Sequence, residues 1–210
     1  MHAINRGRMQ GFSMIEALVT IGALSLVLAI GMPAMSNWVA VSKAQGAAEF
    51  YAEGVRTARA MALKHNSAAR LVFDENATSG QYDWQVDICY PSNDYPCNRN
   101  GSNWSTATAV AAREPEGSSG YKSMVRSARE LPSNTIMSVD IAPDGADAIY
   151  FTSLGWIDTN IPSRVTRVTI GSADPSRWVF PTSSVAISLS GMASKCVPTA
   201  AIGDSRRCPP

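Results

Sequence analysis

The uncharged, apolar run from Ala17 to Met32 restricts the possible fold of this chain more than any other stretch of its sequence. No charged side chain lies between Glu16 and Lys43. The run and its flanks therefore reach the roughly 20 apolar residues that a helix needs to cross a bilayer. The sequence predicts one membrane-spanning helix over about residues 12–35.

A basic start followed by an apolar core is also typical of a secretory signal peptide, and Arg6 and Arg8 supply such a start here. Two features argue against that interpretation. The run is longer than an ordinary signal core, and Glu16 lies just inside it. A carboxylate inside a membrane segment is costly, so it usually marks a function. The alternative is that Glu16 lies among the lipid headgroups, where its charge costs little.

Residues 34–65 continue the helical pattern beyond the apolar run. Apolar side chains and alanines recur there at three- and four-residue steps, and the charged side chains stay off that line. We therefore expect one face of this segment to pack on a globular domain. Asn66 is a plausible stop, because Asn tolerates the left-handed conformation that ends helices.

After the helix the hydrophobic period changes to two, which indicates strands. Strands are expected at residues 69–73, 82–88, 136–141, 148–157, 165–170 and 185–189. A long N-terminal helix followed by consecutive strands predicts an α+β fold with an antiparallel sheet. Residues 91–123 are expected to form a long exposed loop with a short helix near 107–113, and residues 195–210 a Cys-bounded loop.

The four cysteines are candidates for disulfide bonds, because an even number in a domain outside the cytoplasm fits such bonds. They are Cys89, Cys97, Cys196 and Cys208. Four cysteines allow three pairings, of which the sequential one closes two short loops. A zinc site is the alternative, but the sequence has no CxxC pair and only 2 histidines.

The segment Gly11-Phe12-Ser13-Met14-Ile15-Glu16, with Pro33 at the end of the run, resembles the N-terminus of type IV pilins and type II secretion pseudopilins. In that family a prepilin peptidase cuts after the Gly, the new N-terminal Phe is methylated, and Glu is the fifth mature residue. The resemblance implies cleavage after Gly11, methylation of Phe12, and roles in assembly for Glu16 and the helix-bending Pro33. It also implies a pilin-like fold, with the long helix packed on the sheet domain.

The family resemblance also implies how Glu16 would act. The Glu of an incoming subunit pairs with the N-terminal amine of a neighbour in the filament. Phe12 and Glu16 are four residues apart and so lie close to one helix face. Pairing lowers the cost of a charge in lipid and would favour one docking register. The implied partners are prepilin peptidase, other minor and major pilins or pseudopilins, the inner-membrane assembly platform and membrane lipid.

The same resemblance divides the chain into a leader at 1–11, a long helix at 12–66 and a β-rich domain at 67–210. The implied location is a single pass through the inner membrane with a periplasmic domain, which becomes extracellular in a pilus. Loss of Arg6 and Arg8 with the leader lowers the 18 basic side chains to 16, against 17 acidic ones. The global charge therefore gives no support for nucleic-acid binding.

Within the family, the β-rich part is most similar to the minor pseudopilins of the GspH, FimT and FimU group. The similarity lies in Ala58–His65 at the helix end, Phe151–Gly155 as a strand ending in Gly, and Ile187–Gly191 as the last strand. The group implies a minor type IV pilin that takes part in pilus assembly and initiation. The alternatives are a GspH-type pseudopilin of type II secretion and a DNA-binding minor pilin of natural transformation.

DNA binding in some FimT-like proteins uses a Gly-Arg-x-Arg motif, from which this chain departs. Met192 and Ser194 occupy the two arginine positions, and only Lys195 remains. Arg206 and Arg207 in the tail are further candidates for weak, non-specific phosphate contact. A solvated charged tail is the more ordinary interpretation of these cations.

The sequence gives little support for an enzyme or for a cofactor. After cleavage the only histidine is His65, which we expect to be exposed at a helix end, and there is no G-x-S-x-G, phosphate loop or HExxH. Asp140, Asp144 and Asp147 fit an ordinary Asp- and Gly-rich turn better than a calcium site. Four tryptophans are expected to serve in packing: Trp84, Trp104, Trp156 and Trp178.

Overall fold

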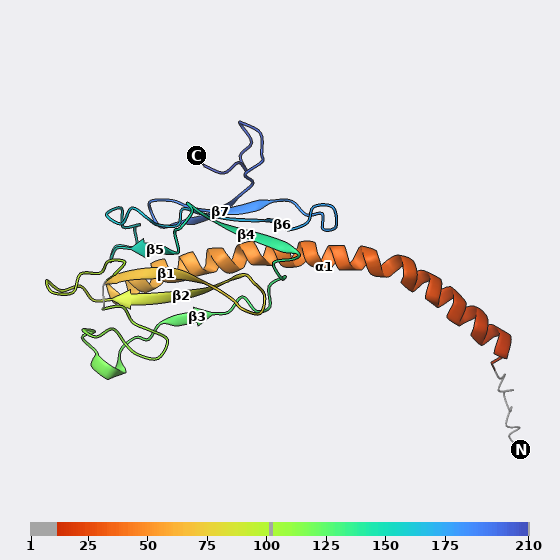
Figure 1. Ribbon diagram of the computed structural model, residues 1–210, viewed down its shortest axis with the longest axis horizontal. Helices are drawn as coiled ribbons and strands as arrows, with labels where there is room; N and C mark the ends of the chain where they lie inside the picture. The colour runs from red at the N-terminus through yellow and green to blue at the C-terminus, as the bar shows by residue number, and fades with distance from the viewer. Residues whose placement is uncertain (1–11, 101–102, 210) are drawn as a thin grey trace, which may run out of the picture. The chain divides into compact units, whose positions relative to one another are not determined.

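The structure of the protein, a computed structural model, describes residues 12–100 and 103–209. In these residues a long helix is followed by strands that form two antiparallel sheets (Figure 1). The chain divides after Val39 into two compact units, which we describe separately. The expected leader, Gly11 included, lies outside the described residues. The architecture is α+β, as the sequence predicted.

Helix α1 (Met14–His65) runs through both units and includes residue 33. Its end is a Schellman motif, in which Asn66 N–H donates to Leu63 O (3.3 Å) and Ser67 N–H donates to Ala62 O (3.1 Å). Asn66 has a left-handed φ of 47°. The helix thus stops where the sequence predicted, because Asn adopts this conformation more readily than most residues.

The first sheet has the order β3-β2-β1-β5. Its strands are β1 (Ala68–Glu75), β2 (Tyr82–Cys89), β3 (Met124–Arg126) and β5 (Ala148–Phe151). The central pair is in register from Ala68 opposite Cys89 to Glu75 opposite Tyr82. Side chains of β1 alternate between buried and half-buried over most of its length, which is the period-two pattern that the sequence indicated.

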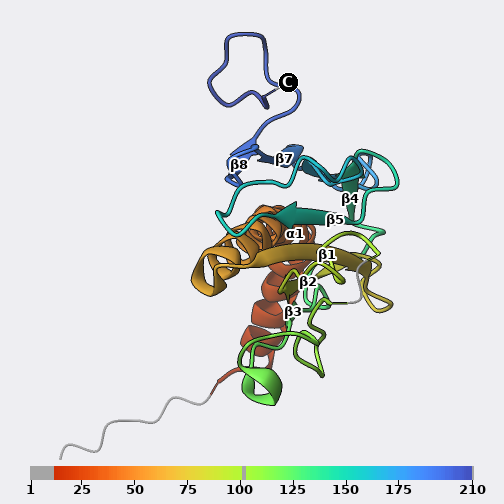
Figure 2. The ribbon, with the colours of Figure 1, turned by 90° about the vertical axis from the view of Figure 1, so that its left-hand side faces the viewer.

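The second sheet has the order β4-β6-β7-β8. Its strands are β4 (Met137–Ala142), β6 (Arg167–Ser172), β7 (Ser183–Ile187) and β8 (Ala193–Cys196). Figure 2 shows the two sheets as neighbouring layers beside the C-terminal half of α1, with the chain after β8 standing away from both.

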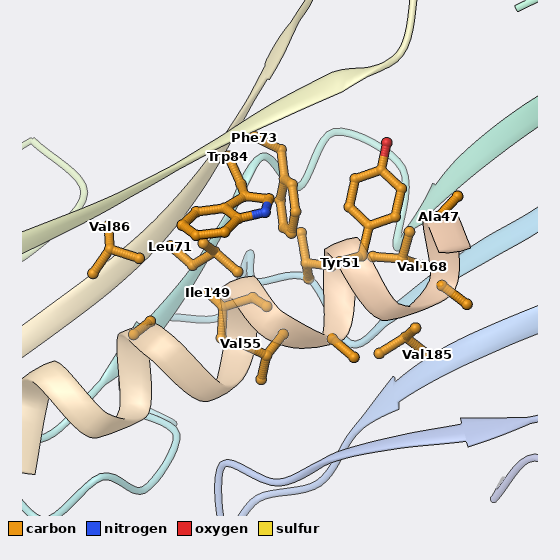
Figure 3. Close-up of a cluster of buried hydrophobic side chains, with 14 of the residues drawn as sticks. Ala47, Tyr51, Val55, Leu71, Phe73, Trp84, Val86, Ile149, Val168 and Val185 are labelled. Carbon is orange, nitrogen blue, oxygen red and sulfur yellow. The ribbon is translucent and has the colours of Figure 1, made fainter. Parts of the chain in front are cut away.

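The main core lies between the C-terminal half of α1 and the inner faces of both sheets. The helix contributes mostly alanines, with Tyr51 and Val55 as its largest fully buried side chains. The sheets contribute larger side chains, labelled in Figure 3: Leu71, Phe73, Trp84, Val86, Ile149, Val168 and Val185. Small residues on the helix let the sheets approach closely, and the bulky sheet residues fill the space between.

Trp84 is the largest of these fully buried side chains. Its indole N–H donates to Phe50 O on α1 (3.0 Å), so its one polar group is satisfied. The ring lies over Gly54, where an added Cβ would come within 3.2 Å of the indole. Gly54 is therefore a site of close approach between helix and sheet, although it lowers helix propensity.

Four strand expectations need correction. The strands expected at 148–157 and at 151–155 end at Phe151, because a turn follows in which Gly155 has a φ of 71°. The strands expected at 185–189 and 187–191 end at Ile187 for the same reason, with Gly191 at a φ of 75°. Strands β3 and β8 were not predicted. Both are short edge strands with few buried side chains, so they lack an apolar period.

The loop and tail also differ in part from expectation. The predicted helix at 107–113 is absent, and Thr106 forms a turn there by accepting the N–H of Ala109 on its hydroxyl (3.0 Å). A 3₁₀ helix, η1 (Gly117–Ser119), lies a few residues later. The predicted disulfides are present, and their pairing is sequential: Cys89–Cys97 and Cys196–Cys208.

Candidate functional site

Ser13 caps the start of α1. Its hydroxyl accepts the N–H of Ile15 (3.3 Å), and its carbonyl accepts the N–H of Ala17 (3.1 Å), so Ser13 is the N-cap. Glu16 is the third helical residue and is exposed. A carboxylate at this position is stabilised by the helix dipole, and Ser-x-x-Glu is the sequence of a capping box. This capping-box sequence is a signal that our prediction missed.

The apolar segment that follows is suited to a lipid environment. Residues Met14–Met32 have a mean hydropathy of 2.1, and none of them is buried. At 1.5 Å per residue they span about 28 Å, close to the thickness of a bilayer's hydrocarbon core. The hydroxyls of Thr20 and Ser25 donate to Ala17 O (2.9 Å) and Ile21 O (2.8 Å) within the helix. The segment could therefore cross a membrane without leaving these hydroxyls unsatisfied.

Two of the three cations considered for phosphate contact are paired with carboxylates. Lys195 forms an ion pair with Glu49 of α1, and Arg206 pairs with Asp204 at 2.8 Å. Hydrogen bonds from Lys195 and then Arg56 lower the pKa of Glu49 to about 2. The tail that carries Arg206 is closed by Cys196–Cys208, but Lys195 is directed to α1. The structure therefore does not bring these cations together as one free basic patch.

His65 is half-buried, so the prediction that it is exposed was wrong. Its Nδ1 lies 3.1 Å from the hydroxyl of Tyr90, which donates to Oε1 of the buried Glu114 (3.1 Å). The same oxygen accepts the N–H of Tyr121 (2.6 Å). Burial, with Glu114 nearby, raises the pKa of the Tyr90 hydroxyl, which keeps this proton donor intact. The cluster attaches the 91–123 loop to the end of α1.

The acidic turn around Gly145 shows no arrangement typical of a cation site. Asp147 is engaged by Arg99, whose Nη2 lies 3.2 Å from both carboxylate oxygens. Asp140 and Asp144 line the same shallow cavity near this turn. Across the part of the chain that the structure describes, no group of three or more His, Cys, Asp or Glu could hold a metal ion.

Comparisons with protein-family models, with curated proteins and with solved structures gave no match.

Proposed function

We propose that the chain is a minor type IV pilin of the GspH, FimT and FimU group, a structural subunit that takes part in pilus assembly and initiation. The sequence spacing of Gly11, Phe12 and Glu16 is the observation that carries this proposal. Glu16 lies near the start of a 19-residue segment of high hydropathy, Met14–Met32, and the same helix continues into the core of an antiparallel α+β unit. A helix of this kind suits a subunit that is stored in the inner membrane and then packs in a filament.

The proposed assembly step uses a charge pair. Cleavage after Gly11 would leave a cationic amine on Phe12, about one helical turn from Glu16. Between neighbouring subunits, Glu16 of one would meet the amine of another, which neutralises both charges in a low-dielectric surrounding. The apolar side chains of the segment would then lie against other subunit helices in place of lipid.

The local role of Glu16 as a capping residue must be separated from this proposed role. In Glu16→Gln the side chain can still complete a capping box, but its charge is lost. We expect recovery of the variant in sheared filaments to fall about tenfold, the change that corresponds to roughly 1.4 kcal/mol. Ser13→Ala, the matched control, removes the cap hydroxyl and keeps the charge, so its recovery should stay near that of the unmodified chain.

Equal recovery of Glu16→Gln and the unmodified chain would contradict the proposed charge pair. Loss of Ser13→Ala, but not of Glu16→Gln, from the membrane fraction would instead show that the capping role dominates. Membrane levels of each variant are therefore measured beside filament recovery.

A GspH-type pseudopilin of type II secretion is the second candidate, because the same N-terminal motif serves both machines. Surface pili are counted by electron microscopy in a deletion strain and after complementation, and secretion of a type II substrate is followed in the same strains. Loss of pili in the deletion strain and their return on complementation would support the minor pilin. Normal pili with lost secretion supports the pseudopilin.

Natural transformation is the remaining candidate, with less support because Lys195 and Arg206 are paired with carboxylates. We propose no catalytic role and no cofactor.

A further inference from the structure

Five large apolar side chains of the globular unit are exposed around two turns and the end of α1. They are Leu63, Leu154, Trp156, Leu189 and Met192, with exposed fractions of 47%, 66%, 60%, 63% and 54%. We call these residues the two-turn surface. Trp156 was expected to serve in packing, and the structure leaves it mostly exposed. Exposed apolar side chains that gather in one place mark a binding surface more often than scattered ones do.

Hydrogen bonds connect the two turns to each other. In the first turn, Thr152 N–H donates to Trp156 O (2.8 Å), and in the second, Ser188 N–H donates to Met192 O (3.0 Å). Ile157 N–H donates to Leu189 O (3.0 Å), which joins one turn to the other. The apolar side chains therefore belong to one connected piece of backbone.

Arg59 attaches both turns to α1. Its Nε lies 3.2 Å from Gly155 O and 3.3 Å from Ser190 O. Both turns need glycine for close approach: a Cβ on Gly191 would lie 2.3 Å from Gly155 O, and one on Gly155 would lie 3.0 Å from Leu63 Cγ. The surface is thus formed in advance, so a partner would lose little free energy in ordering it.

A cavity of about 300 Å³ opens between α1 and the second turn. Ala60, Leu63, Met192 and Ala193 supply apolar lining, and Arg56 and Arg59 line it as well. Its volume is at the lower limit of small-molecule pockets, which run roughly 300–1,000 Å³. It is better suited to one apolar side chain of a partner than to a whole cofactor.

Cations outnumber carboxylates beside this cavity. Arg56 and Lys195 share a single carboxylate, that of Glu49. Arg59 hydrogen-bonds only to carbonyl oxygens in the described contacts and so keeps its charge uncompensated. Lys64 is exposed on the last turn of α1. The rim is therefore positive, and it favours a partner that carries negative charge.

We propose that the two-turn surface binds a segment of a different protein, in which a large apolar side chain enters the cavity and a neighbouring Asp or Glu meets the basic rim. Symmetric pairing with a second copy is disfavoured, because it would set the same basic rim against itself. This inference deepens the proposed function and rests on it for the expectation that the partner is a protein.

The test is site-specific photo-crosslinking in cells that make the full chain, with p-benzoylphenylalanine at position 154. We expect a crosslink to one other protein, at a peptide that contains an acidic residue beside an apolar one. Met192→Glu places a carboxylate in the apolar cavity and should lower the crosslink yield about fivefold or more. Arg56→Gln, which removes a rim cation, should lower it to a smaller extent.

Ile202→Glu is the matched control, because Ile202 is 91% exposed and lies outside the two-turn surface. Its crosslink yield should equal that of the unmodified chain. Membrane levels and both disulfides are checked in every variant, so a misfolded protein is recognised. If Met192→Glu is unstable, Arg56→Gln at an exposed position still reports on the rim.

A crosslink only to another copy of the chain, only to lipid, or to no molecule would overturn the proposed docking surface. So would a crosslink that Met192→Glu and Arg56→Gln leave unchanged in folded protein. Cleavage after Gly11 is measured in the same cells. Normal cleavage without the crosslink would refute the docking surface alone, and the crosslink without cleavage would refute the proposed filament subunit.

Discussion

The two halves of α1 differ in the size and burial of their side chains, although they belong to one helix. In Met14–Met32, large apolar side chains point in all directions and none is buried. In residues 40–62, the buried positions are mostly alanine, and charged side chains occupy the outer face. The first half has a composition suited to lipid, and the second is shaped by a protein surface.

This difference shows what limits side-chain size along a helix. Against two sheets, the helix backbone lies close, so most buried positions accept no more than a methyl group. In Met14–Met32 no side chain is buried, so packing sets no limit on side-chain size, and a lipid surrounding would require only that the side chains be apolar. Equal substitutions in the two halves should therefore have unequal effects on the stability of the globular unit.

The largest expected effect comes from the side chain that fills the contact between α1 and the first sheet. Trp84→Ala should lower the free energy of unfolding by about 3–5 kcal/mol, because it leaves a cavity and removes the indole hydrogen bond to Phe50 O. Val27→Ala in the apolar half should change it by less than about 0.5 kcal/mol. Urea unfolding of the detergent-solubilised chains, followed by circular dichroism, measures both. A change below about 1 kcal/mol for Trp84→Ala would contradict the core described above.

Two Ala→Leu substitutions, one in each half of α1, compare the halves directly. Ala58 is fully buried against the sheets, and Ala23 lies exposed in the apolar half. Ala58→Leu should cost about 1–3 kcal/mol through overpacking. Ala23→Leu should leave the unfolding midpoint of the globular unit unchanged. Equal midpoints for the two variants would show that the halves do not differ in the way that we describe.

The smallest expected effect concerns the ion pair between α1 and β8. The pKa of Glu49 falls from 4.5 to about 2, so its charge stabilises the folded state fully above pH 4.5 and loses this effect as the pH falls toward 2. The contribution is below about 1 kcal/mol, because the pair is half exposed and screened by salt. Thermal unfolding of Glu49→Gln and the unmodified chain should differ at pH 6 and converge near pH 2. A difference that grows on acidification would contradict this assignment.

Much of the fold could be predicted because its signals are local. Asn66 ends α1 as expected, and the alternation in residues 82–88 marks β2 correctly. Strands β3 and β8 escaped prediction, because Met124–Arg126 is wholly exposed and Ala193–Cys196 has one buried side chain. Such edge strands depend on their neighbours in the sheet and leave little trace in sequence.

One of the two candidate sites could likewise be predicted from the sequence, and the other could not. The motif with Gly11, Phe12 and Glu16 lies within one short segment, so sequence alone could indicate it. The two-turn surface combines three distant segments, which Arg59 joins through the carbonyls of Gly155 and Ser190. Backbone carbonyls carry no sequence signal, and the identity of Trp156 does not show whether its side chain is buried or exposed. Only the assembled fold could locate this surface.

The central proposal depends on the N-terminal residue of the chain in the membrane. Intact-mass and peptide mass spectrometry of the protein, purified from membranes of its own cells, would identify that residue directly. We predict an N-terminus at Phe12, methylated on its amine, with the whole apolar segment retained. Cleavage after the apolar segment would identify a secretory signal peptide, and a chain that keeps residues 1–11 would show that no prepilin peptidase acts on it. Either result would contradict the proposed pilin.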